Sequence, residues 1–308
     1  DQALHPRLLA AVDGEGYPRI DDWLTGSSTE LPLLERELLA GSTRHGATST
    51  RVAKVLGRAA AGEDLGEQEI ALLFGARGAD FTRVCAQAAH FNQVLHGDRV
   101  SYVVNRNINY TNVCYFKCQF CAFSKGKAHE NLRGTPYDLD DAELRRRVGE
   151  AWERGATEVC LQGGIHPSYT GRKYLDICAL VKDVAPAMHI HAFSPLEIWQ
   201  GAKTLGVPLA QFIDSLRAAG LGTLPGTAAE ILDDEVRAVL CPDKINTGEW
   251  LQVMEAAHAL GVRSTATVMY GHIENPLHLA RHLLHIKTLQ RRHGGFTEFV
   301  PLPFVAEE

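Results

Sequence analysis

The sequence predicts an α/β protein whose main part is a partial, TIM-like (β/α) barrel. From position 99 onward, short β-prone runs alternate with segments of helical periodicity, which is typical of βα units repeated around a parallel sheet. The alternation yields about six strand-like runs, and no helical pattern follows the last of them. We therefore expect about six βα units over 99–308, with the C-terminal units of the barrel missing.

The expected elements follow the chain in order. Residues 1–50 contain turn formers and charges with little periodicity, so a linker or loosely ordered extension is expected there. Region 51–98 predicts flanking helices, with apolar residues at Ile70, Leu73 and Phe74 and a second segment at 80–96. Strands are expected at 100–108, 158–162, 189–192, 221–224, 264–269 and 297–302. Helices are expected between them at 140–154, 174–185, 208–219, 248–260 and 276–292.

The composition excludes several classes of protein. With 31 basic and 37 acidic side chains the formal net charge is −6, which provides no basic surface for a nucleic-acid backbone. No apolar run approaches the roughly 20 residues needed to cross a bilayer, and no signal peptide is recognisable at the start. We therefore expect a cytoplasmic protein that binds neither nucleic acid nor membrane.

A cluster of cysteines directly follows the first expected strand. Cys114, Cys118 and Cys121 have the spacing CxxxCxxC and make up three of the seven cysteines. Three thiolates can hold three irons of a [4Fe–4S] cube and leave the fourth iron open, as a catalytic metal site requires. The four remaining cysteines fall in helical or strand patterns and are expected to be small core residues: Cys85, Cys160, Cys178 and Cys241.

The alternative for this cluster is a zinc-stabilised binding module, with His129 or another cysteine as the fourth ligand. No second CxxC and no pair of histidines at zinc spacing lies nearby. The positions around the cysteines are aromatic, as in a site that packs a flat ligand: Tyr115, Phe116, Phe120 and Phe123. Both observations favour the iron–sulfur interpretation.

CxxxCxxC with an aromatic residue before the last cysteine, here Phe120, resembles the signature of the radical S-adenosylmethionine (SAM) superfamily. The resemblance implies a [4Fe–4S] cluster and SAM as cofactors. Gly163 and Gly164 follow the second expected strand, where this superfamily has a glycine-rich turn that approaches the amino group of SAM. Ile165 stands where an acidic residue is often found, so the resemblance implies that this contact is made by backbone alone or elsewhere.

Several sequence segments resemble one branch of that superfamily, the tyrosine-using half of FO synthases. These enzymes build the deazaflavin chromophore of coenzyme F420. They lie at 109–123, 162–167, 191–197, 225–230, 269–272 and 301–304, and the resemblance covers about 60–304. It implies transfer of the 4-hydroxybenzyl group of L-tyrosine to 5-amino-6-(D-ribitylamino)uracil by a 5′-deoxyadenosyl radical. Two enzymes of the futalosine route to menaquinone, aminofutalosine synthase and dehypoxanthine futalosine cyclase, share many of these sequence segments. They remain the alternative assignment within the superfamily.

The same resemblance implies partners. An electron donor such as ferredoxin or flavodoxin is expected, together with the other FO synthase half, fused or separate. The chain begins at Asp1 without an initiator Met, which with the linker-like start indicates a fragment of a fused protein.

Two carboxylates are candidates for holding SAM. Glu230 follows a glycine turn after the fourth expected strand, where the resemblance implies a contact with the ribose hydroxyls. The alternative for Glu230 is an acid stabilised by a helix N-terminus. Glu197 has a similar place after the third expected strand.

Four further side chains are candidates for contacting substrate. His189 and His191 alternate along one strand, so both lie on the same face, which is either the lumen or the helix layer. Catalytic groups of such barrels lie at the C-terminal ends of the strands. The substrate candidates are His166, His191, Tyr270 and His272.

Overall fold

The computed structural model describes residues 48–116, 118, 120–121 and 135–304. Most of the expected extension at 1–50, together with Phe123 and His129, lies outside the described residues. The chain divides into two compact units, Asp1–Arg99 and Val100–Glu308. The described part of the first unit contains three helices, α3 (Thr50–Ala60), α4 (Glu67–Phe74) and α5 (Ala79–His96). No helix among the described residues has the length and apolar character that a membrane span requires.

The second unit is a half-barrel of six parallel strands whose order in the sheet follows the chain, β1 to β6. This confirms the partial barrel expected from the alternation of βα units. The strands are β1 (Asn105–Asn109), β2 (Glu158–Gln162), β3 (His189–Ala192), β4 (Thr223–Leu224), β5 (Arg263–Tyr270) and β6 (Phe296–Pro303). The helices are α6 (Asp141–Glu153), α7 (Gly171–Val184), α8 (Pro195–Leu205), α9 (Leu209–Ala218), α10 (Asp234–Leu240), α11 (Thr247–Ala259) and α12 (Pro276–His293).

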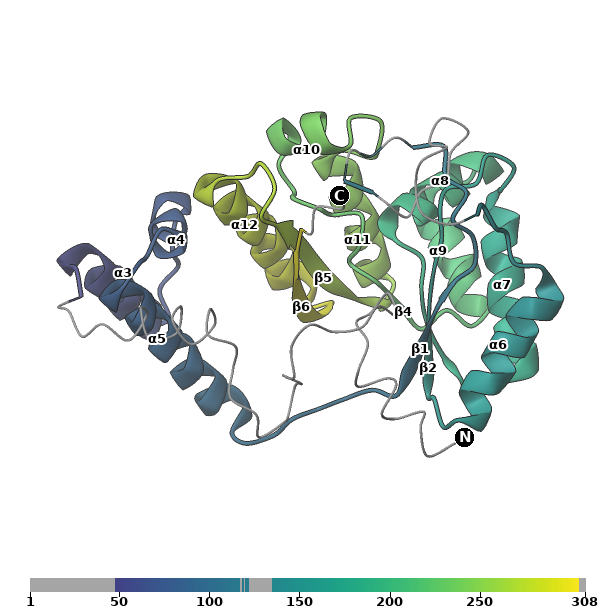
Figure 1. The fold of residues 1–308 in the computed structure, drawn as a ribbon, viewed down its shortest axis with the longest axis horizontal. Coiled ribbons are helices and arrows are strands. Elements are labelled where there is room, and N and C mark those ends of the chain that lie inside the picture. Colours follow the sequence, from purple (N-terminus) through teal and green to yellow (C-terminus); the bar gives the residue numbers. More distant parts are fainter. Residues whose placement is uncertain (1–47, 117, 119, 122–134, 305–308) are drawn as a thin grey trace. The chain divides into compact units, whose positions relative to one another are not determined.

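The sheet has one apolar and one polar side. Along β2 and β3 every second residue is fully buried, including Val159, Leu161 and Ile190, and these residues belong to the same core as Leu144 of α6. Figure 1 shows α6 and α7 beside β1 and β2, with the sheet curving away from them. The other side of the strands faces the lumen, and its residues are only half-buried.

The first strand is shorter than expected because a strand needs a partner. Asn105 pairs with Glu158, the first residue of β2, so the β-prone residues before Asn105 have no neighbouring strand to pair with. Val100 and Val103 are accordingly exposed. The expectation of a strand beginning at 100 is wrong for this reason.

Two helices, α8 and α10, were not expected, although α8 has a clear sequence signal. Ser194 caps the helix and Glu197 reaches back to it, which is the capping box that Ser-Pro-Leu-Glu encodes. The expectation for Cys85 is also wrong, because α5 has no buried residue and this thiol is exposed. Cys178 and Cys241 are buried as expected, whereas Cys160 is only half-buried on the lumen side.

Candidate active site

The chain that follows β1 is held against the turn that follows β2. The amide of Tyr110 donates to the Gln162 carbonyl at 3.2 Å, and the amide of Gly164 donates to the Thr111 carbonyl at 2.9 Å. Further along, the amide of Tyr115 donates to the Ile165 carbonyl at 3.2 Å. These three bonds extend the pairing of β1 and β2 and fix the backbone on both sides of Cys114.

Gly163 and Gly164 allow the cysteine-bearing segment after β1 to approach the turn after β2 closely. A Cβ atom on Gly164 would lie 2.3 Å from the Val113 carbonyl oxygen and 2.9 Å from the Cys114 Cβ. A Cβ atom on Gly163 would lie 2.4 Å from the ring of Tyr110. Any side chain here would therefore push the cysteine-bearing segment away from the sheet.

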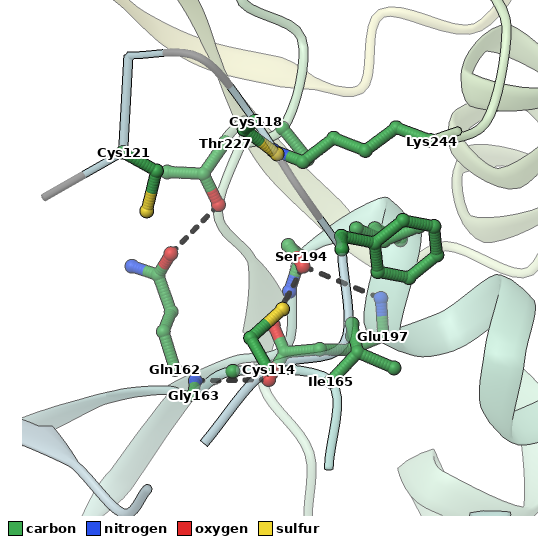
Figure 2. A pocket seen from close by; sticks show the side chains of 14 residues that line it. Cys114, Cys118, Cys121, Gln162, Gly163, Ile165, Ser194, Glu197, Thr227 and Lys244 are labelled. Carbon is green, nitrogen blue, oxygen red and sulfur yellow. Dashed lines mark hydrogen bonds between the residues drawn. The ribbon is translucent and has the colours of Figure 1, made fainter. Parts of the chain in front are cut away.

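All three cysteines of the CxxxCxxC motif line one cavity beyond the C-terminal end of β2. Its volume of about 150 Å³ is at least ten times the roughly 10–15 Å³ that one water requires. Figure 2 shows the cysteines around this space, with Gln162 and Lys244 at its sides. Of the expected cofactor contacts, three also line it, namely Gly163, Gly164 and Glu197, whereas Phe120 and Glu230 do not.

The donor set of this cavity fits an iron–sulfur cluster. Cys114, Cys118 and Cys121 form no disulfide with another described residue, are partly exposed and line the cavity. Burial raises the pKa of Cys118 to about 12, although the nearby Lys244 ammonium opposes this effect, and burial also raises the pKa of Cys114. Iron binds the thiolate form, so ligation must displace these protons. Three soft sulfur ligands on one cavity are suited to an iron–sulfur cluster.

Lys244, which the sequence reasoning missed, brings a positive charge to the same cavity. Its Nζ atom lies 2.8 Å from Glu230 Oε1, and both side chains are only 12% exposed. The ammonium also lies 5.2 Å from the ring centre of Phe120. Burial alone would lower the pKa of Lys244, but attraction to Glu230 and Cys118 raises it, so the lysine is charged. Phe120 and Glu230 therefore lie beside the cavity, behind Lys244.

Glu230 occupies a strained part of the chain. Its backbone φ angle is +43°, a value uncommon for a residue other than glycine. The helix that follows, α10, has Asp233 as its N-cap, so Glu230 lies outside the first helical turn. Its carboxylate is thus held by the buried lysine, and the helix-terminus alternative does not describe it.

The buried carboxylate of Glu197 accepts hydrogen bonds from three other residues. One carboxylate oxygen accepts bonds from the Ser194 amide at 2.7 Å and the Ser194 hydroxyl at 2.6 Å. The other oxygen accepts from the Gly163 amide at 3.1 Å and from the Tyr110 hydroxyl. Burial raises the pKa of Glu197 to about 7, although these donors favour the ionised form. Glu197 therefore joins the end of β1, the glycine turn and the start of α8.

This network predicts a stability that depends on pH. The folded-state pKa of Glu197, about 7, lies above its ordinary value of 4.5, so its protonated form is favoured by folding. The resulting stabilisation is complete below about pH 4.5 and is lost as the pH rises through 7. We expect the unfolding free energy of the wild-type protein, minus that of Glu197→Gln, to fall by about 2 kcal/mol from about pH 5.5 to 8.5. Urea unfolding of both proteins, monitored by fluorescence at each pH, measures this difference in unfolding free energy. A difference that stays constant or rises with pH contradicts the prediction.

The other candidate side chains lie in different surroundings. His166 is bonded through Nδ1 to the Ser168 hydroxyl at 2.8 Å and packs its ring on Tyr169. Tyr270 ends β5 and is 40% exposed, while the ring of His272 packs edge-on against Phe304. None of these three candidates is among the residues that line the cysteine cavity.

His191 lies on the lumen side of β3, and its Nδ1 lies 2.7 Å from the Thr223 hydroxyl. Burial, together with the neighbouring His189, lowers the pKa of His191 to about 4, so its ring is neutral near pH 7. The sequence alternation correctly paired the two histidines on one face, and the structure identifies that face as the lumen.

Comparison with known proteins places this arrangement in a family. The model of the radical SAM superfamily matches residues 108–286. The chain is 42% identical over 256 residues to the 5-amino-6-(D-ribitylamino)uracil–L-tyrosine 4-hydroxyphenyl transferase of Methanothermobacter thermautotrophicus, covering 83% of this chain and 68% of the relative. It is 46% identical over 241 residues to the FO synthase of Streptomyces coelicolor, covering 78% of this chain but only 27% of that relative. The futalosine-pathway and zinc-module alternatives are not favoured by these relatives.

The fold has solved counterparts. The FeFe-hydrogenase maturase HydG from Carboxydothermus hydrogenoformans superimposes with a TM-score of 0.63 at 18% identity, covering 83% of this chain and 57% of that one. Identity at this level supports the architecture alone, and the family assignment rests on the sequence matches. With its cysteine motif at the end of β1, the chain belongs to the radical SAM superfamily, which implies a [4Fe–4S] cluster and SAM.

Proposed function

We propose that this chain transfers the 4-hydroxybenzyl group of L-tyrosine to 5-amino-6-(D-ribitylamino)uracil in the biosynthesis of FO, the deazaflavin part of coenzyme F420. The observation that carries the proposal is the CxxxCxxC cavity in a chain that shares 42% identity over 83% of its length with a transferase named for this reaction. The FO synthases that it matches are about four times longer than the aligned part, so a second half is proposed as a fused or separate partner. A ferredoxin or flavodoxin is proposed as the electron donor.

In this proposal Cys114, Cys118 and Cys121 would be the three protein ligands of a [4Fe–4S] cluster. The reduced cluster and bound SAM would supply the radical chemistry that activates tyrosine. The protein has to hold the reactants in line and exclude water. Gly163 and Gly164 offer backbone groups at the wall of the cavity.

The buried carboxylates act in two different ways. Glu197 has four donors directed at its oxygens, so it acts as a positioning residue that fixes Gly163 rather than as a direct ligand. Glu230 and Phe120 flank Lys244, whose charge offsets the negative charge of three thiolates. A direct contact between Glu230 and the SAM ribose stays a proposal. So do substrate contacts by His166, His191, Tyr270 and His272.

The test is a reaction with reconstituted protein. After anaerobic loading with iron and sulfide, the reduced protein receives SAM, L-tyrosine and 5-amino-6-(D-ribitylamino)uracil. We expect 5′-deoxyadenosine and a hydroxybenzyl adduct of the uracil by mass spectrometry, and neither product when SAM is omitted. Colourless protein that retains zinc and leaves SAM intact would overturn the radical SAM mechanism. Cleavage of SAM together with turnover of a futalosine-type substrate, and no adduct, would overturn the choice of substrates.

A further inference from the structure

The lumen side of β1 to β4 is polar in successive layers. The strand register places Asn107, Cys160, His191 and Thr223 side by side in one layer. Barrel interiors of this type are usually filled with branched apolar side chains. Polar side chains in that place leave hydrogen-bonding groups that a polar ligand can satisfy.

Two further polar layers lie on either side of this layer, one toward the C-terminal ends of the strands and one toward their starts. Asn109 pairs with Gln162 at the end of the strands nearest the cysteines, and Glu158 pairs with His189 in the layer toward the strand starts. Successive layers are two residues apart along the strand, which corresponds to about 6.6 Å. Gln162 connects the upper layer to the cavity, because its Oε1 accepts from the Thr227 hydroxyl at 2.7 Å and both residues line the cavity. Figure 2 shows this bond at the side of the cysteine cavity.

The middle layer is preorganised by one hydroxyl. Thr223 Oγ1 lies 2.8 Å from His189 Nε2 and 2.7 Å from His191 Nδ1. A hydroxyl has one proton, so at least one of the two imidazoles must donate to it, and both rings are held in orientation. Gly222 makes room for this pair, since a Cβ atom there would lie 2.3 Å from the His189 ring. Within the described part of the chain, His191 Nε2 is left without a protein partner.

The groups on this side favour a neutral ligand rich in hydroxyls. A neutral imidazole and a threonine hydroxyl each pair with an alcohol, which donates and accepts equally well. The charged residues near this side are Glu158 in the lower layer, Glu298 of β6, which lies close enough to repel Glu158, and Arg263, which is the register neighbour of Thr223. Among the described residues on this side, positive charge is therefore not in excess, and nothing there selects an anion such as a phosphate ester.

We infer that this polar layer, formed by Asn107, Cys160, His191 and Thr223, binds the ribityl chain of the aminouracil substrate. This inference rests on the proposed function and adds the orientation of that substrate. From the nitrogen that joins it to the uracil ring to its terminal hydroxyl, the extended ribityl chain spans six bonds and about 7.5 Å, given bonds of roughly 1.5 Å. It can therefore bridge the spacing between the Gln162 layer and the His191 layer. The uracil ring then lies at the upper layer, with its reacting carbon toward the cysteine cavity.

Binding measurements without turnover test this inference. Anaerobic calorimetry compares 5-amino-6-(D-ribitylamino)uracil with 5,6-diaminouracil, which lacks the ribityl chain. We expect the reconstituted wild-type protein to bind the ribityl compound at least about 30-fold more tightly. Thr223→Val keeps the shape and removes the hydroxyl, and His191→Phe removes the free nitrogen; each should reduce this preference about tenfold. Affinity for 5,6-diaminouracil should stay within about threefold.

Ile190→Val is the matched control. It lies between the two histidines on β3 but points into the helix-side core, so it should leave the preference unchanged. Equal affinity of the wild-type protein for both compounds, or a preference that survives both lumen substitutions, overturns the inference and leaves the proposed function standing. Failure of the wild-type protein to bind either compound overturns both. If His191→Phe does not fold, Thr223→Val alone decides the outcome.

Discussion

Replacing Gly164 by alanine should reduce SAM cleavage by at least about 100-fold while the protein remains folded. The added Cβ would lie 2.3 Å from the Val113 carbonyl oxygen, an atom of the backbone that cannot rotate away. The segment bearing Cys114 must therefore shift, and a displacement of about 1 Å at a catalytic site can cost a factor of 10² in rate. Iron content after anaerobic reconstitution and the yield of 5′-deoxyadenosine measure the effect.

Gly149→Ala provides the control for this substitution. Gly149 lies inside α6, and a Cβ atom there would meet only Val184, at an ordinary distance of 3.9 Å. Alanine is preferred to glycine in a helix interior by about 1 kcal/mol, so this variant should be as stable as the wild type or more so. Full iron content and undiminished SAM cleavage in Gly164→Ala would show that the close approach of the two segments is unimportant.

Replacing Lys244 by methionine should lower the unfolding free energy by about 3–5 kcal/mol, because it leaves a buried carboxylate without its partner. The partner is Glu230, whose side chain is only 12% exposed and whose oxygen lies 2.8 Å from Lys244 Nζ. The iron content should fall as well, since the cavity loses its cation beside Cys118. Urea unfolding and iron analysis of the purified variant measure the two effects.

Two further variants distinguish a specific pair from a general loss of packing. Adding Glu230→Gln to Lys244→Met removes the unpaired charge, so the double variant should recover at least half of the lost stability. Arg145→Met breaks an exposed ion pair with Asp183 and should cost less than about 1 kcal/mol. If the double variant is no more stable than Lys244→Met, electrostatic pairing is not what Lys244 contributes.

The fold was predictable where local pattern and tertiary structure agree. Alternating apolar residues such as Val159 and Leu161 mark a strand with one buried face, and the half-barrel follows from repeated βα units. The start of β1 could not be predicted, because it depends on where β2 offers a partner. The helix α8 was predictable in principle, since Ser194 and Glu197 form a capping box that is written in the sequence.

The residues of the candidate site also fall into those that the sequence reveals and those that only the folded structure reveals. The cysteine spacing is local in the chain, so three ligands were evident from the sequence. Lys244 lies in a loop more than a hundred residues later, and no local signal distinguishes it from other lysines. Its importance arises only when the loop at 241–246 places its ammonium between Glu230 and Phe120. Alternation put His189 and His191 together, but only the packing of Ile190 into the core shows which way they face.

The network around Glu197 has a consequence for how the metal centre is assembled during synthesis. The cysteine segment takes its shape from the glycine turn, and Glu197, which fixes that turn, follows Cys114 by roughly eighty residues. At about 5–20 residues per second, the ribosome needs roughly 4–16 s to add them. During that interval the Glu197 contact that fixes the glycine turn cannot form. We therefore expect the cluster to be inserted only after Glu197 has been synthesised and the glycine turn has folded.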